Sequence, residues 1–310
     1  MAGAFAIARG AKTHVDVIAC EVVGDGLAGR GEGTPIYYRG ETAAGCVATI
    51  RRWADAGAHD DRGRLLAELG PGAARNALDC ALWDLEAQRA QAPVWQLAGV
   101  AAPIPTPTAY TVSLGSGEVM GQAARSAVER GFRLLKLKLA GDGEDLARVA
   151  AVRRGAPHAR LVVDANESWA GRDIVVEARA LAAHGVELIE QPLPAGSDAA
   201  LERLASPVPL CADESCHTPD DLAEVARRYQ AVNVKLDKAG GLTAALALAQ
   251  QARERGLDVM LGCMLSTSRA IRFALPLGRL ARWVDLDGPV LLAADRAEGL
   301  RYQGGLIWPD

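Results

Sequence analysis

Features that mark several protein classes are missing from this sequence of 310 residues. No apolar run approaches the ~20 residues that cross a bilayer, and the chain does not start with a basic stretch followed by an apolar one. The six cysteines are scattered without a CxxC pair, which is typical of a reducing compartment and argues against a disulfide framework. A net charge of −4 gives no reason to expect nucleic acid or an anionic membrane as a partner. We therefore expect a soluble cytoplasmic protein with neither partner.

The length and the apolar content of 50% allow one large domain or two. The proline-rich segment 103–107 (PIPTP) is the clearest break in composition. It predicts a first domain over 1–104 and a second over 105–288, with the C-terminal segment 289–310 returning to the first domain.

Within the first domain, residues 1–35 predict antiparallel sheet with a hairpin turn at Gly24-Asp25-Gly26. Residues 42–98 are mostly helical, and the segment 73–89 carries apolar residues at helical spacing. The first domain is therefore expected to be α+β.

From Thr108 onward, apolar strands alternate with helical patterns at a regular pitch. The predicted strands end 22 to 28 residues apart, near Thr111, Lys138, Asp164, Glu190, Asp213, Lys235, Cys263 and Asp285. Eight strands with helices between them at this pitch predict an α/β fold, a parallel (β/α)8 barrel of the TIM type. A doubly wound open sheet is the competing fold, but the segment 113–117 (SLGSG) matches its glycine-rich phosphate turn poorly.

Charged residues end five consecutive strands, at the edge where parallel barrels build their active sites. Asp164, Glu190 and Asp213 come from three adjacent strands, so their carboxylates can converge on one point. Three bare carboxylates would repel each other unless a cation lay among them. All-oxygen ligation suits Mg²⁺, and Mn²⁺ also fits. The alternative is a carboxylate cluster that lysines alone neutralise.

Two lysines lie on either side of this carboxylate triad. Lys138 ends the strand before it and Lys235 ends the strand after it, so they should flank a bound metal from opposite sides. Ammonium groups facing each other across a cation can have lowered pKa values. A lysine tuned in this way can act as a base near neutral pH.

Motifs at the strand ends resemble those of the enolase superfamily and, within it, the muconate-lactonising subgroup. They are KxK at 136–138, DAN at 164–166, EQP at 190–192, ADES at 212–215 and NVK at 233–235. Four further stretches resemble the dipeptide epimerases of that subgroup: IARG at 7–10, TPIYYRGET at 34–42, KLDKAGGLT at 235–243 and VDLDGP at 284–289. The resemblance covers essentially the whole chain. It implies a modified barrel of the (β/α)7β type, with residues 1–100 as the capping domain.

The resemblance also implies a mechanism. One Mg²⁺ per subunit would bind the substrate carboxylate, and Lys136 would offset its charge further. One of Lys138 and Lys235 would remove the α-proton to give a metal-stabilised enediolate, and the other would return a proton to the opposite face. This two-base 1,1-proton transfer inverts the centre. A homo-oligomer that epimerises L-Ala-L-Glu to L-Ala-D-Glu in murein peptide metabolism is expected.

The resemblance further assigns residues to the substrate. Asp285 and Asp287, which share one face because they are two apart, would bind the α-ammonium group of a dipeptide. Thr111 and Asn166 would lie near the substrate, and Arg9 of the capping domain would hold a side-chain carboxylate such as that of Glu.

Two loops are expected at the pocket. They contribute Tyr37, Tyr38 and Arg39 from the capping domain, and Met264, Ser266 and Thr267 after the seventh strand. Asp237 is expected to orient a lysine rather than to bind metal.

Other functions of the same superfamily make different demands on the residues. Sugar-acid dehydratases typically use a histidine base late in the barrel, and no histidine follows His217. An N-acylamino acid racemase, for example one acting on N-acetylglutamate, or an o-succinylbenzoate synthase would keep the metal and both lysines. Neither needs an ammonium-binding DxD pair. A catalytically inactive, metal-stabilised binding protein is the alternative from another class, and α-proton exchange in D₂O distinguishes it from an enzyme.

Overall fold

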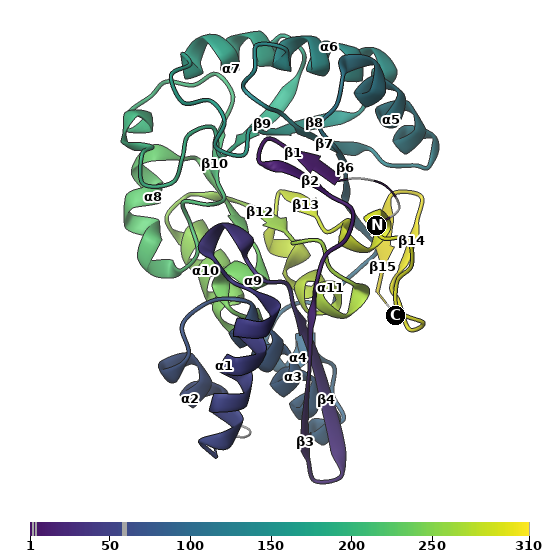
Figure 1. Cartoon of the computed structure of the whole chain (residues 1–310), viewed down its shortest axis with the longest axis vertical. Helices are drawn as coiled ribbons and strands as arrows, with labels where there is room; N and C mark the ends of the chain where they lie inside the picture. The colour runs from purple at the N-terminus through teal and green to yellow at the C-terminus, as the bar shows by residue number, and fades with distance from the viewer. Residues whose placement is uncertain (2, 4, 58–60, 310) are drawn as a thin grey trace.

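The computed structural model describes residues 1, 3, 5–57 and 61–309, and its central feature is a sheet of eight parallel strands (Figure 1). Each strand pairs with its neighbour in the sequence: β6 (Ala109–Val112), β7 (Leu134–Lys138), β8 (Arg160–Asp164), β9 (Val186–Glu190), β10 (Leu210–Ala212), β11 (Ala231–Val234), β12 (Asp258–Gly262) and β13 (Trp283–Asp285). The last strand lies beside the first, where Leu286 N donates to Thr108 Oγ1 at 2.9 Å. The predicted TIM-like barrel is therefore confirmed, with strand ends within about one residue of those expected.

Helices cover the outside of this barrel. They are α5 (Gly117–Glu129), α6 (Asp145–Gly155), α7 (Ile174–Ala182), α8 (Leu222–Arg228), α9 (Leu236–Ala239), α10 (Leu242–Glu254) and α11 (Ser268–Ala274). Side-chain caps fix where several begin: the Ser116 hydroxyl accepts from Val119 N, and Asp173 accepts from Val175 N and Val176 N. After β9 a 3-10 turn, η2 (Ala199–Leu201), replaces the expected helix. After the last strand, β13, the described chain continues with the 3-10 turn η5 (Gly288–Leu291) and no α-helix, and this is the position that a (β/α)7β barrel leaves without a helix.

Inside the barrel, each strand contributes one residue to an apolar layer. Its members are Ala109, Leu134, Val162, Leu188, Cys211, Ala231, Met260 and Trp283. Side chains of a strand alternate between its two faces, so the residues two positions further along point into the same interior. Seven of these eight next residues are polar: Thr111, Lys136, Asp164, Glu190, Asp213, Asn233 and Asp285, with Gly262 as the eighth. The apolar layer is therefore the floor of a polar site.

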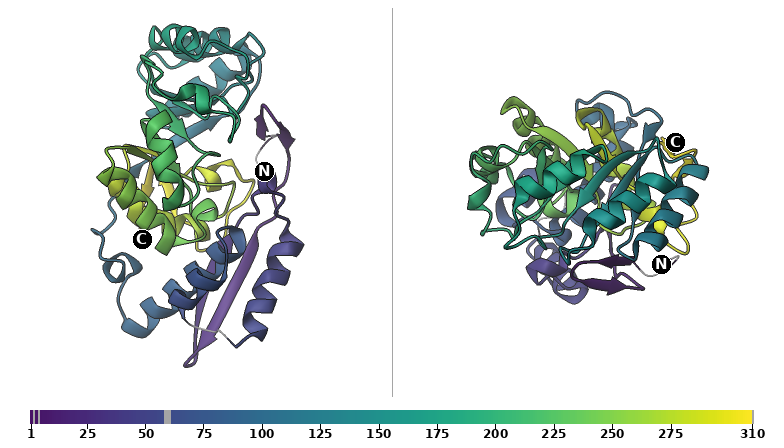
Figure 2. Two further views of the ribbon diagram at one scale, coloured as in Figure 1. Left: turned by 90° about the vertical axis from the view of Figure 1, so that its left-hand side faces the viewer. Right: turned by 90° about the horizontal axis from the view of Figure 1, so that it is seen from above.

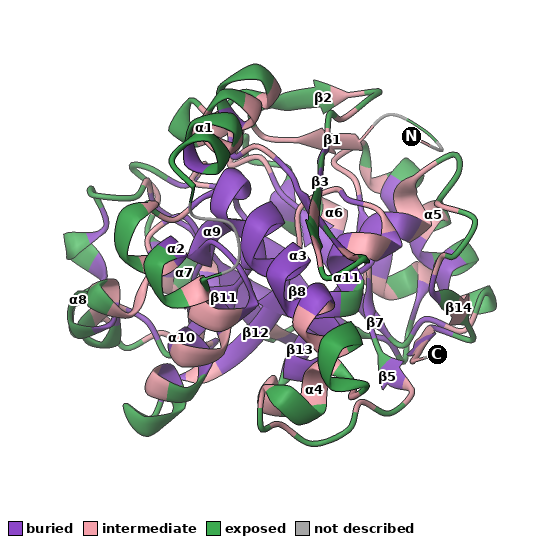
Figure 3. Ribbon diagram, turned by 90° about the horizontal axis from the view of Figure 1, so that it is seen from below, coloured by how far each residue is buried: buried purple, intermediate pink, exposed green. Residues whose placement is uncertain are grey.

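The capping domain packs against one side of the barrel (Figure 2). Its elements are the hairpins β1 (Phe5–Ile7) with β2 (Gly10–Lys12) and β3 (Ile18–Gly24) with β4 (Leu27–Gly33), then η1 (Tyr37–Arg39) and the helices α1 (Ala43–Asp55), α2 (Arg62–Glu68), α3 (Ala73–Ala90) and α4 (Val94–Leu97). Figure 3 shows α3 as a buried helix at the centre of this layer. The predicted α+β composition and the turn at Asp25-Gly26 are confirmed.

Glycines let β4 approach α3 closely. A Cβ atom at Gly29, Gly31 or Gly33 would lie 2.0 to 2.3 Å from a backbone carbonyl oxygen of α3. No side chain fits at such distances, so the alternating glycines of the GRGEG stretch are needed where hairpin and helix meet.

The C-terminal segment makes contacts in two directions. Its hairpin, β14 (Arg301–Gln303) with β15 (Leu306–Trp308), pairs with β5 (Thr106–Pro107) at the start of the barrel. Arg296 instead forms an ion pair of 2.7 Å with Glu32 of the capping domain. Both the return of 289–310 to the first domain and the boundary at 104/105 stay predictions. Among the residues that the structure describes, no helix is both long and apolar enough to cross a membrane.

Candidate active site

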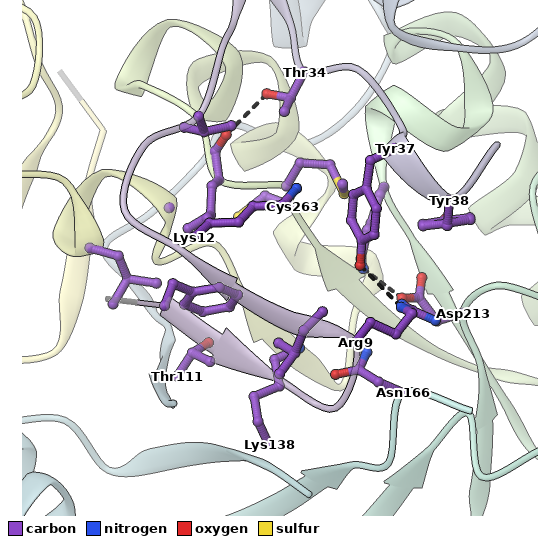
Figure 4. A pocket seen from close by; sticks show the side chains of 18 of the residues that line it. Arg9, Lys12, Thr34, Tyr37, Tyr38, Thr111, Lys138, Asn166, Asp213 and Cys263 are labelled. Carbon is purple, nitrogen blue, oxygen red and sulfur yellow. Dashed lines mark hydrogen bonds and ion pairs between the residues drawn. The ribbon is translucent and has the colours of Figure 1, made fainter. Parts of the chain in front are cut away.

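A cavity of about 210 Å³ lies at the carboxyl ends of the barrel strands (Figure 4). The β1–β2 hairpin and the loop with Tyr37 and Tyr38 border it on the side of the capping domain. Twelve of the residues predicted for the site line it: Arg9, Tyr37, Tyr38, Thr111, Lys136, Lys138, Asn166, Asp213, Lys235, Met264, Asp285 and Asp287. Asp164 and Glu190 do not line it and have no exposed surface.

The three predicted metal ligands end neighbouring strands in register. Asp164 of β8 pairs with Glu190 of β9. On its other side Glu190 pairs with Cys211 of β10, and Asp213 lies two residues beyond Cys211. Lys136 reaches between them, with its Nζ 2.7 Å from Glu190 Oε2 and 3.4 Å from Asp164 Oδ2. The sheet register therefore places the three strand ends that carry these carboxylates side by side.

Two further lysines hold the outer carboxylates of this group. Lys138 Nζ lies 2.6 Å from Asp164 Oδ2, and Lys235 Nζ lies 2.6 Å from Asp213 Oδ2. Because β8, β9 and β10 separate β7 from β11, the two ammonium groups approach the triad from opposite ends. This is the placement expected for a pair of bases.

Burial and neighbouring charge shift the pKa values of the carboxylates in different directions. Burial raises the pKa of Glu190 to about 7, and Asp164 adds to that rise while Lys136 opposes it. Burial also acts to raise the pKa of Asp164, but Lys138 and Lys136 outweigh it and bring this pKa down to about 2. The pKa of Asp213 is lowered because Lys235 and Lys238 outweigh its burial.

The donor set fits a hard divalent cation. Glu190 Oε2 and Asp213 Oδ1 are buried and accept no hydrogen bond, although a lysine ammonium lies 2.7 Å from each of them. Those ammonium groups are close enough for an ion pair but poorly aimed for a hydrogen bond, so each oxygen keeps a lone pair free. Within the described part of the chain, no three acidic, His or Cys side chains are already gathered as a metal cage. The lysines that hold the carboxylates would have to give way to the ion.

Side chains that the sequence prediction missed hold the ligands in place. Asn233 Nδ2 donates to Glu190 Oε1 at 2.7 Å. The Gln191 amide oxygen accepts from Asp213 N and Ser215 N at 2.8 and 3.1 Å. Lys238, which is fully buried, donates to the carbonyl oxygens of Asp213 and Cys216. Asn233 could have been found from the alternation of β11, because it lies two residues before Lys235.

Asp285 and Asp287 have different surroundings. Asp285 Oδ2 lies 2.9 Å from Lys136 Nζ, so this carboxylate is already paired. Asp287 accepts a hydrogen bond of 2.6 Å from Thr111 N and has no ion pair among the described residues. Burial and the charge of Asp285 raise the pKa of Asp287 to about 7. Of the two, Asp287 is the carboxylate that can accept a new cation.

Arg9 is held by groups of the protein on all three nitrogens of its guanidinium. Nε donates to the Tyr37 hydroxyl at 3.1 Å, Nη1 lies 2.5 Å from Glu167 Oε2, and Nη2 pairs with Glu214. Neither glutamate was predicted at the site, although Glu214 directly follows Asp213. Arg9 therefore lies at the cavity, where it was placed, but with partners that only folding reveals.

Three residues expected at the site make contacts away from the cavity. Asp237 does not orient a lysine, because its Oδ1 accepts from Thr34 N at 2.8 Å and from Asn76 Nδ2 at 2.7 Å and so joins the capping domain to α9. Ser266 is buried and lies outside the set of residues that line the cavity. Thr267 caps α11 and donates to Glu32, which turns it toward the capping domain.

Arg39 also departs from expectation, since it is exposed and lies outside the set of residues that line the cavity. The two tyrosines before it do line the cavity. The αL residue Gly40, with φ of 77°, ends the 3-10 turn η1 directly after Arg39.

The fold and the site define a class of protein. A barrel whose strand ends carry three carboxylates between two lysines is built for metal-assisted proton transfer next to a carbonyl group.

Comparison with known proteins places the chain within that class. Residues 118–309 match the family described as enolase C-terminal domain-like, and residues 1–99 match the N-terminal domain of mandelate racemase and muconate lactonizing enzyme. The chain belongs to this mandelate racemase and muconate lactonizing enzyme family of the enolase superfamily, and it is an enzyme of the racemase and epimerase type. The resemblance seen in the sequence is confirmed.

Two characterised relatives differ in substrate. The L-Ala-D/L-Glu epimerase of Escherichia coli (strain K12) is 46% identical over 305 residues, which cover 97% of this chain and 94% of the relative. The N-acetyl-D-glutamate racemase of a Pseudoalteromonas species is 47% identical over 246 residues, which cover 79% of this chain and 76% of the relative.

Solved structures agree with the fold over the whole chain. An enolase family member from Agrobacterium tumefaciens, described with bound sodium, L-Ala-L-Glu and an ordered loop, has a TM-score of 0.95 and 43% identity and covers 100% of this chain and 94% of its own. A dipeptide epimerase from Enterococcus faecalis in complex with Mg and L-Leu-L-Tyr has a TM-score of 0.92 and 31% identity, and covers 99% and 93%.

Proposed function

We propose that this protein is a Mg²⁺-dependent dipeptide epimerase that interconverts L-Ala-L-Glu and L-Ala-D-Glu by two-base proton transfer. The observation that carries the proposal is the placement of Lys138 and Lys235 at opposite ends of the carboxylate triad, each 2.6 Å from a different carboxylate. Inversion needs one group to remove the α-proton and another to deliver a proton to the opposite face. A single base on one side could only exchange the proton.

Asp164, Glu190 and Asp213 are the residues that would hold Mg²⁺, and Mn²⁺ could replace it. When bound, the ion supplies a Lewis acid that draws negative charge from the substrate carboxylate. Lys136 adds a fixed positive charge at the same place, because Asp285, Glu190 and Asp164 raise its pKa against the effect of burial. The charge that develops as the α-proton leaves is therefore met by preorganised groups in a buried site.

Lys235 must be neutral to accept a proton. Burial lowers its pKa, but Asp213 outweighs burial and the net shift is upward. A cation held by Asp213 would take up the charge that now stabilises the Lys235 ammonium group, and the pKa of Lys235 would then be lower. Lys138 forms the corresponding ion pair with Asp164 at the other end of the triad.

The α-ammonium group of a dipeptide would be received by Asp287, with Asp285 oriented beside it through Lys136. A buried carboxylate without a cation is costly, which favours a substrate that brings a positive charge. An N-acyl substrate has no ammonium group, so this observation favours dipeptides over N-acetylglutamate. N-acylamino acid racemisation is the second candidate, because the Pseudoalteromonas relative has that activity. Synthesis of o-succinylbenzoate remains the third.

Thr111, Asn166, Tyr38 and Met264 would shape the pocket around the peptide. Arg9 remains a predicted partner of the substrate side chain, although it would first have to exchange Glu167 or Glu214. We further infer a cytoplasmic, homo-oligomeric enzyme of murein peptide metabolism. Light scattering at the elution peak from a sizing column tests the oligomer, and growth on murein dipeptides of a strain lacking the gene tests the pathway.

Incubation in D₂O with Mg²⁺ tests the proposed reaction. Proton NMR should show loss of the Glu α-proton signal from L-Ala-L-Glu together with formation of the L,D epimer, and chelation should stop both. N-acetyl-L-glutamate and N-acetyl-D-glutamate serve as the competing substrates. Faster exchange of these compounds than of the dipeptide would support the racemase, and exchange of none would support a binding protein.

A further inference from the structure

Lysine is rare in this chain, and its distribution is uneven. Only five of the 34 Lys and Arg residues are lysines, at positions 12, 136, 138, 235 and 238. Four of them belong to the buried site in the barrel. The fifth, Lys12, ends β2 of the hairpin that borders the cavity, and it lines the cavity as well. Elsewhere on the surface the positive charge comes from arginine, so the presence of a lysine beside the cavity needs an explanation.

The cations that line the cavity differ in whether a carboxylate already neutralises them. Lys136, Lys138 and Lys235 each lie within 2.9 Å of at least one carboxylate oxygen. Arg9 pairs with both Glu167 and Glu214, and its remaining nitrogen donates to Tyr37. A substrate anion that approached any of these four would compete with a partner already in place.

Lys12 is the exception among the cavity-lining residues that the structure describes. Its Nζ lies 3.8 Å from the centre of the Tyr37 ring, and the described part of the chain places no carboxylate within ion-pair distance of it. A ring face holds an ammonium group more weakly than a carboxylate does. The Tyr37 hydroxyl is tied to Arg9, so the ring stays in place when the ammonium moves. Burial and the nearby Arg9 lower the pKa of Lys12, and an anion that bound there would relieve this effect.

We infer that Lys12 binds the side-chain carboxylate of the dipeptide's second residue and thereby sets a preference for acidic dipeptides. This inference rests on the proposed epimerase function and adds the residue that selects the side chain. In this arrangement Arg9 acts as a positioning residue. It fastens the β1–β2 hairpin to Glu167 and Glu214 at the barrel, and so presents Lys12, three residues further on, to the cavity. A compact ammonium on a flexible stem can turn from the ring to a carboxylate without breaking an ion pair.

Comparison of L-Ala-L-Glu with L-Ala-L-Gln tests this, because the two differ in charge and hardly in shape. The readout is the ratio of their kcat/KM values. Lys12→Met should lower that ratio by about 10- to 100-fold, the effect of losing one charge-assisted hydrogen bond, chiefly through KM for the acidic dipeptide. Lys12→Arg, which keeps the charge, should restore most of the ratio. Arg30→Met is the matched control, since Arg30 is exposed on the β3–β4 hairpin and paired with Glu21. It should leave the ratio unchanged.

Calorimetric binding of both dipeptides to the Mg²⁺-loaded protein separates failure of this inference from failure of the proposed function. If the wild type binds L-Ala-L-Glu more tightly than L-Ala-L-Gln, Lys12→Met should remove most of the difference whether or not turnover is seen. A wild type that turns over neither dipeptide contradicts the proposed function alone. The assignment to Lys12 would be overturned if Lys12→Met kept both the ratio of kcat/KM values and the difference in affinity. It would also be overturned if Arg9→Met lost them while Lys12→Met did not.

Discussion

Lys138 and Lys235 lie at opposite ends of one row of carboxylates, with Lys138 Nζ 2.6 Å from Asp164 Oδ2 and Lys235 Nζ 2.6 Å from Asp213 Oδ2. Three strands separate the two lysines in the sheet. A substrate α-carbon held between them would present one face to each ammonium group. This separation is the structural basis for inversion, and it makes the two lysines non-equivalent.

Replacement of either lysine should therefore stop epimerisation but leave half of the exchange chemistry. We expect Lys138→Ala and Lys235→Ala each to lower epimerisation by at least about 10²- to 10⁴-fold, the usual contribution of a positioned acid or base. Each variant should still exchange the α-proton of one epimer, and the two variants should act on opposite epimers. Proton NMR in D₂O with L,L and L,D dipeptides measures both. Full epimerisation by either variant would contradict the two-base assignment.

Asp287→Asn should distinguish an ammonium-binding role from a structural one. The amide can still accept the hydrogen bond from Thr111 N but no longer attracts a cation. KM for L-Ala-L-Glu should rise by about 10-fold or more, the loss of one charge-assisted contact, without a comparable change for N-acetylglutamate. Equal losses on both substrates would count against the ammonium role. Circular dichroism of the variant checks that the fold is intact.

Gly262→Ala should lower the affinity for Mg²⁺ indirectly, by displacing Asn233. A Cβ at this position would lie 2.4 Å from Asn233 Oδ1, and Asn233 holds Glu190 Oε1 at 2.7 Å. Displacement of such a supporting group typically costs 10- to 100-fold in metal affinity, and we expect a loss of about that size for Mg²⁺ by calorimetry.

Gly70→Ala is the control for that experiment, because no heavy atom lies within 4 Å of its added Cβ and its φ is ordinary. It should bind Mg²⁺ like the wild type. If Gly262→Ala also binds Mg²⁺ normally, Asn233 is not needed to position Glu190.

Asp237→Asn should change how stability depends on pH. Burial raises the pKa of Asp237 from 3.8 to about 7, so the folded protein holds a proton that the unfolded chain has lost between these values. The stability that this provides is fully present below about pH 4 and is lost as the pH rises through 7. The loss is at most about 4 kcal/mol, at 1.36 kcal/mol for each pKa unit.

The amide of Asp237→Asn can accept the same hydrogen bonds from Thr34 N and Asn76 without ionising. The variant should therefore be more stable than the wild type at pH 8, with a smaller difference at pH 4. Urea unfolding at the two pH values measures this. A variant that is less stable than the wild type at pH 8 would show that the charged carboxylate stabilises the junction between capping domain and barrel.

Prediction from sequence succeeded where the determining forces are local. The pitch of strands and helices predicted the barrel, because each parallel crossover needs a helix-length connection. The alternation of side chains along β7 placed Lys136 and Lys138 on the interior face, and the same period would have placed Asn233 next to Lys235. The contacts of Thr267 and Asp237 could not be predicted in this way, because these side chains bond to Glu32, Thr34 and Asn76 of the capping domain, which their own segments do not indicate.

The spacing of apolar strands and helical patterns is enough to predict the eight strands, and the charged residues at the strand ends are enough to predict a metal site with a lysine on either side. Periodicity and connection length act over short stretches, so they can be read without coordinates. Which partner each charged side chain takes cannot be predicted from such short stretches. Arg9 is 158 residues from Glu167 and 205 from Glu214, and Asp237 is 203 residues from Thr34. Such pairs form only when the capping domain packs on the barrel, because that packing sets which buried charges lie within a few ångströms of each other.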